Sequence, residues 1–182
     1  DNHLFKVNKE VLIPRIESMD IVNMAEKILS SKVSASLADI GTGSGALGIA
    51  AYLRRKAKNQ NTDLVMSDIS QTAVEVAKEN WKLLVGEERV EILVSDLMTD
   101  FPDKKFDLIM GNLPYIPSFR VKGLPESVVD YEPHVALDGG NEGLEIIFRF
   151  LTQAKNFLTP DGSVILEIDY AHTIEDFVGK GF

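Results

Sequence analysis

Three glycines at alternate positions, Gly41, Gly43 and Gly45, constrain the fold of this chain more than any other feature. They follow an apolar segment, residues 36–40, that predicts a short strand, and they precede residues 46–55, whose apolar periodicity predicts a helix. Glycines at such a junction let the backbone turn tightly, and they let a ligand approach the main-chain N–H groups at the start of the helix. The run therefore predicts a ligand-binding turn, and a glycine-rich turn without a ligand is the alternative.

The residues around the glycines distinguish between two nucleotide ligands. Gly43, Gly45 and Gly48 fit the G-x-G-x-x-G spacing of a dinucleotide site. Asp39 comes just before them, and negative charge there is poorly placed for a pyrophosphate. The pattern D-x-G-x-G-x-G resembles the motif of methyltransferases that use S-adenosylmethionine (SAM), a cofactor with an ammonium and a sulfonium. We therefore expect SAM, and an NAD-dependent oxidoreductase is a weaker alternative.

Composition narrows the class of protein further. A chain of 182 residues, 45% of them hydrophobic, suits one globular domain. Its net charge of −9 argues against broad non-specific contact with nucleic acid. It has no cysteine, which fits a reducing compartment, and no apolar run of membrane-spanning length or signal peptide. Its three histidines are scattered, without metal-ligand spacing. We expect a cytoplasmic protein with neither a membrane nor a metal partner.

Apolar patterns alternate between strand and helix along the chain. The predicted strands are residues 36–40, 63–67, 90–95, 106–111 and 163–168, and the predicted helices are residues 16–30, 46–55, 70–84, 144–158 and 171–178. Such alternation predicts an α/β fold with a doubly wound, Rossmann-like, mostly parallel sheet.

Two parts of the chain fall outside this alternation. Residues 1–35 form an extended segment and a helix that lead into the methyltransferase domain, which we expect to span residues 36–182. Residues 116–143 show no strong periodicity, and a loop of that length in a compact domain is more often functional than accidental. Residues 160–162, Pro-Asp-Gly, predict a turn.

Carboxylates follow the first three predicted strands. Asp39, Asp68 and Asp96 stand at these strand ends, where ligands bind in doubly wound sheets. Each alone would be an ordinary helix cap or surface acid. Together they form an anionic rim that suits an ammonium, a ribose diol and an exocyclic amine. We expect Asp68 to bind the ribose hydroxyls and Asp96 the adenine amine, while Asp39 orders the glycine turn and faces the methionine end.

The candidate cofactor-binding residues therefore come from the ends of four strands. They are Asp39, Gly41, Thr42, Gly43, Ser44, Gly45, Asp68, Ile69, Asp96, Leu97 and Asn112.

The sequence Asn112-Leu113-Pro114-Tyr115 follows the fourth predicted strand. A planar NH2 group is a poor nucleophile, and two acceptors that hold its N–H bonds can orient the nitrogen and stabilise its developing charge. The side-chain oxygen of Asn112 and the carbonyl of Leu113 are the two candidates. Pro114 restricts Leu113 to extended conformations, and Tyr115 can cover the planar group. The candidate catalytic residues are Asn112, Pro114 and Tyr115, and the candidate substrate-binding residues are Asn112, Leu113, Pro114, Tyr115 and Arg15. A proline turn with a core tyrosine is the alternative.

These motifs together resemble the HemK/PrmC family, the release factor protein-(glutamine-N5) methyltransferases. Residues 11–15 resemble the start of its V-L-I-P-R-P-E-T-E motif, residues 39–50 its cofactor motif, residues 112–115 its N-P-P-Y, and residues 132–144 its E-P-x-x-A-L-x-G-G-x-x-G-L. The resemblance implies SAM as cofactor and, as substrate and partner, a peptide-chain release factor. The acceptor would be the glutamine of its Gly-Gly-Gln loop, and contact with nucleic acid would arise only through the release factor on the ribosome.

The departures from the family pattern keep two other functions open. Leu113 replaces a proline, and N-L-P-Y is the form in ribosomal RNA adenine dimethylases, so an adenine-N6 methyltransferase on RNA or DNA is one alternative. Nothing in the chain corresponds to the family's N-terminal docking domain or its C-terminal antiparallel hairpin. We therefore expect a C-terminally incomplete domain with an exposed edge beside the last strand. A non-catalytic SAM-binding partner subunit is the other alternative.

Overall fold

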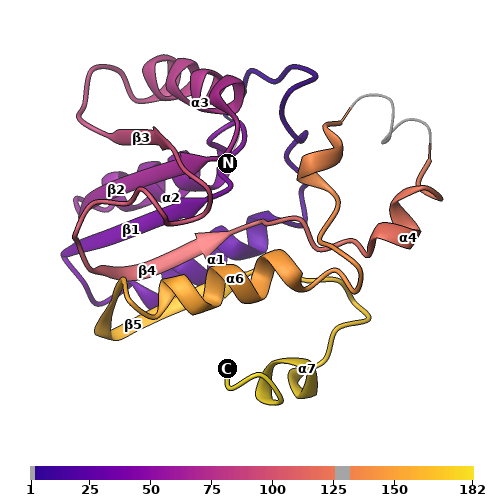
Figure 1. The fold of residues 1–182 in the computed structure, drawn as a ribbon. Helices are drawn as coiled ribbons and strands as arrows, with labels where there is room; N and C mark the ends of the chain where they lie inside the picture. Colours follow the sequence, from indigo (N-terminus) through magenta and orange to yellow (C-terminus); the bar gives the residue numbers. More distant parts are fainter. Residues whose placement is uncertain (1–2, 126–131) are drawn as a thin grey trace.

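The computed structural model describes residues 3–125 and 132–182. Its centre is a parallel sheet of five strands in the order β3-β2-β1-β4-β5 (Figure 1). The strands are β1 Ser34–Ile40, β2 Asn61–Asp68, β3 Glu91–Val94, β4 Phe106–Gly111 and β5 Leu158–Leu166. The helices are α1 Met19–Ile28, α2 Ala46–Ala57, α3 Gln71–Leu84, α4 Ser118–Val121, the 3-10 helix η1 His134–Ala136, α6 Glu145–Ala154 and α7 Ile174–Val178. The predicted doubly wound α/β sheet is confirmed.

The sheet is covered on both faces. Helices α1, α2 and α3 pack together on one face, where Leu37 of β1 belongs to their apolar core. On the other face α6 packs with residues around Met98, and Ala38 and Ile40 of β1 belong to that second core. A strand that is buried on both faces needs apolar side chains on each, and Leu37, Ala38 and Ile40 of β1 supply them.

The strand order places the switch point between β1 and β4. The chain moves outward from β1 to β2 and β3, then returns to the other side of β1 for β4 and β5. The connection that follows β1 and the one that follows β4 run in opposite directions from this point, so a crevice forms beyond the carboxyl ends of these two strands. The glycine turn follows β1 and the segment that starts at Asn112 follows β4, so both predicted motifs open into the same crevice.

The last strand begins earlier than the sequence predicts. Residues 160–162 lie inside β5, at a register shift in which Leu158 pairs with Phe106 and Ser163 with Leu108. Three extra residues of β5 lie between these two pairs, so the Pro-Asp-Gly sequence makes a local irregularity inside the strand and does not precede it as predicted. The strand is at the edge of the sheet, where a residue without an N–H donor is tolerated.

The long segment of residues 116–143 contains short elements that the sequence pattern does not predict. Helix α4 and the 3-10 helix η1 lie within it, and a parallel bridge between Ile116 and Asp138 joins its two ends. Residues 126–131 of this segment lie outside the described residues. In the described ranges, no helix is both long enough and apolar enough to cross a membrane.

Candidate active site

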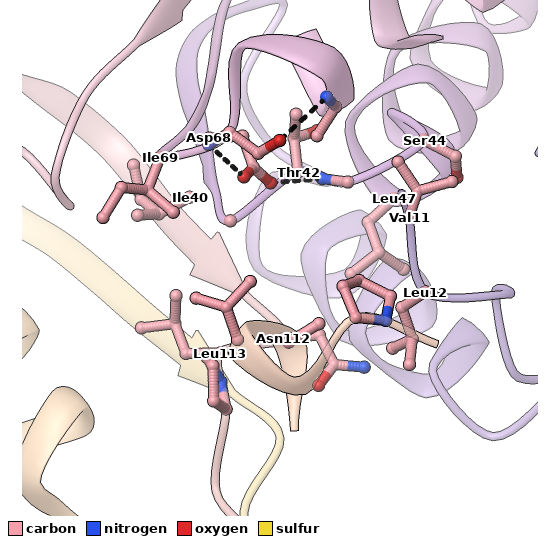
Figure 2. Close-up of a pocket in the computed structure, with 18 of the residues that line it drawn as sticks. Val11, Leu12, Ile40, Thr42, Ser44, Leu47, Asp68, Ile69, Asn112 and Leu113 are labelled. Atoms are coloured by element: carbon pink, nitrogen blue, oxygen red, sulfur yellow. Dashed lines mark hydrogen bonds between the residues drawn. The ribbon is translucent and has the colours of Figure 1, made fainter. Parts of the chain in front are cut away.

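A cavity lies beyond the carboxyl ends of the central strands, and the predicted site residues converge on it. Asp68 and Ile69 lie on one side, and Asn112 and Leu113 lie on the other (Figure 2). The predicted site residues that line it are Gly41, Thr42, Gly43, Ser44, Asp68, Ile69, Asp96, Leu97, Asn112, Leu113 and Pro114. The predicted residues that do not line it are Asp39, Gly45, Tyr115 and Arg15. Val11, Leu12 and Pro14 of the N-terminal segment also line the cavity.

The glycine turn has the backbone conformation that its sequence predicts. Gly41, Gly43 and Gly45 all have positive φ angles, 67°, 55° and 82°. At Gly43 an added Cβ would meet no atom within 4 Å, and this residue borders the cavity. At Gly45 a Cβ would come within 2.9 Å of the Ile49 side chain. One glycine therefore leaves room for a ligand, whereas the other leaves room for the first turn of α2.

Asp39 lies behind the glycine turn and holds it in place. Its carboxylate is fully buried, and Oδ2 accepts hydrogen bonds from Thr42 Oγ1 at 2.6 Å and from the Gly48 amide at 2.9 Å. Oδ1 has no hydrogen-bond partner within the described parts of the chain. Burial raises the pKa of Asp39 to about 7; the two hydrogen bonds oppose this rise, and the charge of Asp68 adds to it.

Asp68 connects the glycine turn to the start of α3. Its Oδ2 accepts from the Gly43 amide at 2.9 Å, and its Oδ1 accepts from the Ser70 amide, also at 2.9 Å (Figure 2). The Ser70 hydroxyl accepts from the Ala73 amide and caps α3. Burial raises the pKa of Asp68, and the backbone hydrogen bonds oppose that rise.

Asp96 pairs with a residue that the sequence did not indicate. Its Oδ2 lies 2.6 Å from Nη2 of Arg149, which projects from α6 and also lines the cavity. Both side chains are about half exposed, at 46% and 54%. Arg149 lies outside the apolar stripe of its helix, so periodicity predicts exposure for it and gives no sign of its partner.

Asn112 is held by two residues from distant parts of the chain. Its Nδ2 donates to Ser18 Oγ and to Glu167 Oε2, both at 3.0 Å. Ser18 occupies the N-cap position of α1, yet its hydroxyl makes no cap hydrogen bond and donates instead to Glu167 Oε2 at 2.7 Å. Oδ1 of Asn112 accepts no hydrogen bond from a described residue. The amide is anchored through its nitrogen, and its oxygen remains available as an acceptor.

Leu113 packs its side chain against the glycine turn. The side chain is buried, and a Cβ on Gly41 would come within 2.9 Å of Leu113 Cδ2. Its backbone carbonyl accepts no hydrogen bond within residues 3–125 and 132–182. Leu113 therefore contributes an apolar wall to the cavity and a backbone carbonyl that carries no hydrogen bond from a described residue.

Tyr115 is not among the residues that line the cavity. Its hydroxyl donates to Glu167 Oε1 at 2.7 Å, and burial together with the Glu167 carboxylate raises its pKa above the ordinary value. Two glycines pack against its backbone. A Cβ on Gly139 would lie 2.7 Å from the Pro114 carbonyl and 2.8 Å from Tyr115 Cα, and one on Gly143 would overlap the Tyr115 carbonyl. The glycines of residues 132–144 let that segment press against the Asn-Leu-Pro-Tyr turn.

Arg15 forms an ion pair with Glu132. Its Nη2 lies 2.6 Å from Oε1 and 2.8 Å from Oε2 of Glu132, whose side chain is only 2% exposed. The pair joins the N-terminal motif to residues 132–144. No cluster of His, Asp or Glu in the described ranges could hold a metal ion.

Glu167 is the main site residue that sequence reasoning missed. It follows directly after β5, whereas Asp39 is the penultimate residue of β1 and Asp68 is the last residue of β2. The strand-end rule that selected those two carboxylates would therefore have selected Glu167 too. The predicted strand extended to residue 168 and placed Glu167 within the strand. Because β5 ends at Leu166, the carboxylate stands beside the other strand ends.

Comparisons with known proteins identify relatives of this chain. The family model for the methyltransferase small domain matches residues 17–123. A release factor glutamine methyltransferase of Lactococcus lactis is 39% identical over 167 residues, which are 91% of this chain and 58% of the relative. One from Leptospira interrogans is 38% identical over 190 residues, which are 100% of this chain and 64% of the relative. The chain thus spans roughly three fifths of the length of these relatives.

Solved structures share the fold. The ribosomal protein L11 methylase of Lactobacillus delbrueckii subsp. bulgaricus has a TM-score of 0.62 at 24% identity, over 94% of this chain and 68% of that one. A SAM-dependent methyltransferase of Agrobacterium tumefaciens has a TM-score of 0.60 at 14% identity, over 89% of this chain and 47% of that one.

The sheet order and the glycine turn at its switch point define a class I methyltransferase fold. More particularly, the chain belongs to the methyltransferase small domain family. The predicted resemblance to the HemK/PrmC family is confirmed by the curated relatives.

Proposed function

We propose that this chain transfers a methyl group from SAM to the side-chain amide nitrogen, N5, of a glutamine in the Gly-Gly-Gln loop of a peptide-chain release factor. The observation that carries the proposal is the pair of available acceptors at one edge of the cavity, Asn112 Oδ1 and the Leu113 carbonyl. Two acceptors match the two N–H bonds of a primary amide. The names of relatives at 38–41% identity support a release factor as the substrate.

The residues around the glycine turn fit SAM. The open side of Gly43 would admit a ligand against the main chain, and Asp68 and Asp96 give the cavity an anionic rim. Asp68 uses two of its roughly four lone-pair sites on Gly43 and Ser70, which leaves capacity for ribose hydroxyls. Asp96 would accept from the adenine amine beside Arg149. A pyrophosphate would meet repulsion at the same rim.

Bound SAM supplies an electrophilic methyl group on a positively charged sulfur. With SAM bound, the lone pair of the glutamine nitrogen would bond to the methyl carbon, and the electron pair of the broken carbon–sulfur bond would stay on sulfur. The nitrogen would then be positively charged, and one N–H proton would leave to water. Asn112 Oδ1 and the Leu113 carbonyl would hold the two N–H bonds throughout, and these hydrogen bonds strengthen as charge develops on the nitrogen.

Release factors act on the ribosome, so we place the reaction in the cytoplasm. The runner-up function is methylation of adenine N6 on RNA or DNA, because Leu113 gives the turn the N-L-P-Y sequence found in the ribosomal RNA adenine dimethylases. An adenine amine has the same two N–H bonds, so the acceptor pair alone does not separate the two substrates.

The test is transfer of labelled methyl from SAM to four acceptors: a release factor, the same protein with its Gly-Gly-Gln glutamine replaced by alanine, ribosomal RNA and duplex DNA. Calorimetry measures SAM binding in parallel. The proposal requires label on the release factor that disappears with the glutamine. Label on nucleic acid would move the function to the adenine reaction, and bound SAM with no label on any acceptor would favour a non-catalytic partner subunit.

A further inference from the structure

One carboxylate outside the predicted motifs, that of Glu167, accepts hydrogen bonds from three polar side chains beside the two proposed acceptors, Asn112 Oδ1 and the Leu113 carbonyl. We call the side of the cavity with these two acceptors the acceptor edge. Glu167 accepts from Ser18 Oγ at 2.7 Å, from Asn112 Nδ2 at 3.0 Å and from the Tyr115 hydroxyl at 2.7 Å. These three donors belong to two separate parts of the chain, Ser18 before α1 and the turn of residues 112–115, and all three are uncharged. Within residues 3–125 and 132–182, Glu167 takes part in no salt bridge. Its role in this structure is therefore that of a hydrogen-bond acceptor.

The carboxylate determines which way the Asn112 amide faces. An ionised carboxylate can only accept hydrogen bonds, whereas an amide has one donor end and one acceptor end. A half-turn of the Asn112 amide would set Oδ1 against Glu167 Oε2 and would leave a donor pointing at the acceptor edge. Ser18 favours the same orientation of the Asn112 amide. Its hydroxyl donates a hydrogen bond to Glu167, so its oxygen can accept one from Asn112 Nδ2.

The same carboxylate also fixes the tyrosine. Oε1 of Glu167 holds the Tyr115 hydroxyl, while Oε2 holds Ser18 and Asn112. Tyr115 and Asn112 lie at the two ends of one turn, so Glu167 restrains both ends of the segment whose Leu113 carbonyl is the second acceptor. Hydrogen-bond networks of this kind lock the rotamers on which precise positioning depends.

We propose that Glu167 is a positioning residue for methyl transfer, which sets the Asn112 amide so that Oδ1 faces the acceptor nitrogen. The inference rests on the proposed function in one respect, that the acceptor is a planar NH2 group. Glu167 itself touches neither the methyl group nor the acceptor. It acts through Asn112.

The first test does not depend on activity. Nitrogen-15 NMR follows the exchange of the Asn112 side-chain amide protons with water in the wild type, Glu167→Leu and Glu167→Gln. The matched control is Glu175→Leu, which removes an exposed carboxylate from α7. In Glu167→Leu we expect exchange to be about tenfold faster, because the Nδ2 acceptor is lost. In Glu167→Gln exchange should stay near that of wild type, because the Gln oxygen can replace Oε2 while the Tyr115 hydroxyl rotates to accept from its NH2. Unchanged exchange in Glu167→Leu would overturn the proposal.

The second test is a double-mutant cycle on single-turnover methyl transfer. Glu167→Leu should slow transfer about 100-fold, the scale of a misplaced reacting group, and leave the dissociation constant of SAM within about threefold. The double variant Asn112→Ala/Glu167→Leu should be no slower than Asn112→Ala alone, because Glu167 acts through that side chain. Independent, multiplicative losses would contradict the proposal. If the wild type transfers no methyl to a release factor, the proposed function fails, and the exchange measurement still decides the role of Glu167.

Discussion

The two sides of the cavity are built in different ways. On the glycine side, Asp39 and Asp68 bond mainly to backbone amides, and the partners are 2 to 25 positions apart in the sequence. On the acceptor side, Asn112, Tyr115 and Ser18 bond to one another's side chains or to Glu167, and the partners are 52 to 149 positions apart. The glycine side is a local backbone structure that presents a binding surface. The acceptor side is a long-range side-chain network that sets the direction of one amide.

This difference leads us to expect that variants on the two sides fail in different ways. The glycine side should control the affinity for SAM, and the acceptor side should control the rate of transfer at saturating SAM.

The largest effect is expected at Asn112. Asn112→Ala removes one of the two acceptors for the N–H bonds, and we expect single-turnover transfer to fall about 1000-fold while SAM affinity changes by no more than about threefold. Asn141→Ala, at an exposed position of residues 132–144, is the control and should keep the wild-type rate. A parallel loss of SAM affinity in Asn112→Ala would show that the two sides are not separate.

Asp68 should show the opposite pattern. Asp68→Ala removes the acceptor of the Gly43 and Ser70 amides together with the proposed ribose contact. We expect the dissociation constant of SAM, measured by calorimetry, to rise about 100-fold, and the rate at saturating SAM to stay within about fivefold. Asp63→Ala, at an exposed carboxylate of β2, is the matched control. A rate defect that saturating SAM does not restore would place Asp68 in the chemical step.

The pH dependence of stability tests the glycine side in the absence of any ligand. Asp39 has a pKa raised from 3.8 to about 7, so the folded state keeps its proton in the range where the unfolded state has lost it. Its contribution to stability is therefore complete below pH 4 and is lost as the pH rises through 7. Between pH 5 and pH 7 this loss should be about 2 kcal/mol of unfolding free energy.

Asp39→Asn removes the titrating group while its side-chain oxygen still accepts from Thr42 and Gly48. Urea unfolding at pH 5 and pH 7 should therefore show a smaller decline in the variant than in the wild type. The same decline in both proteins would mean that Asp39 is ionised throughout this range.

Gly139 provides the mildest test, on the acceptor side. A methyl group there would press on the Pro114 carbonyl and Tyr115 Cα, and we expect Gly139→Ala to slow transfer about tenfold without a change in SAM affinity. At Gly123 an added Cβ has no neighbour closer than 3.5 Å, so Gly123→Ala is the control for the substitution itself. Wild-type kinetics for Gly139→Ala would mean that the Asn-Leu-Pro-Tyr turn tolerates displacement.

The same contrast explains which parts of the molecule sequence reasoning could predict. The glycine turn, the Ser70 cap and the strand-end aspartates are local patterns in which each residue's role depends on near neighbours. The sequence located the glycine turn and the aspartates, but Asp39 is buried behind the turn and does not line the cavity. Apolar runs located all five strands, although the irregularity at residues 160–162 shifted the limits of the last one.

The acceptor side could be predicted only in part. The residue types of the Asn-Leu-Pro-Tyr turn suggested its chemistry, but its supports come from chain segments that only the folded structure brings together. Ser18 occupies the N-cap position of α1 but bonds to Glu167, and nothing in the local sequence of Glu167 or Arg149 identifies their partners. Arg15 was predicted to bind substrate because it matches the family motif, and in the structure its guanidinium forms an ion pair with Glu132.

The most direct test of the account is to map where the cofactor binds. Backbone amide shifts are followed by NMR while SAM is titrated into the chain. We expect saturable shifts that are largest at residues 41–45, 68–70 and 95–97, with the Asn112 side-chain amide still bound to Glu167 at saturation. Saturable shifts that leave the glycine turn unchanged, or no saturation at millimolar SAM, would contradict it.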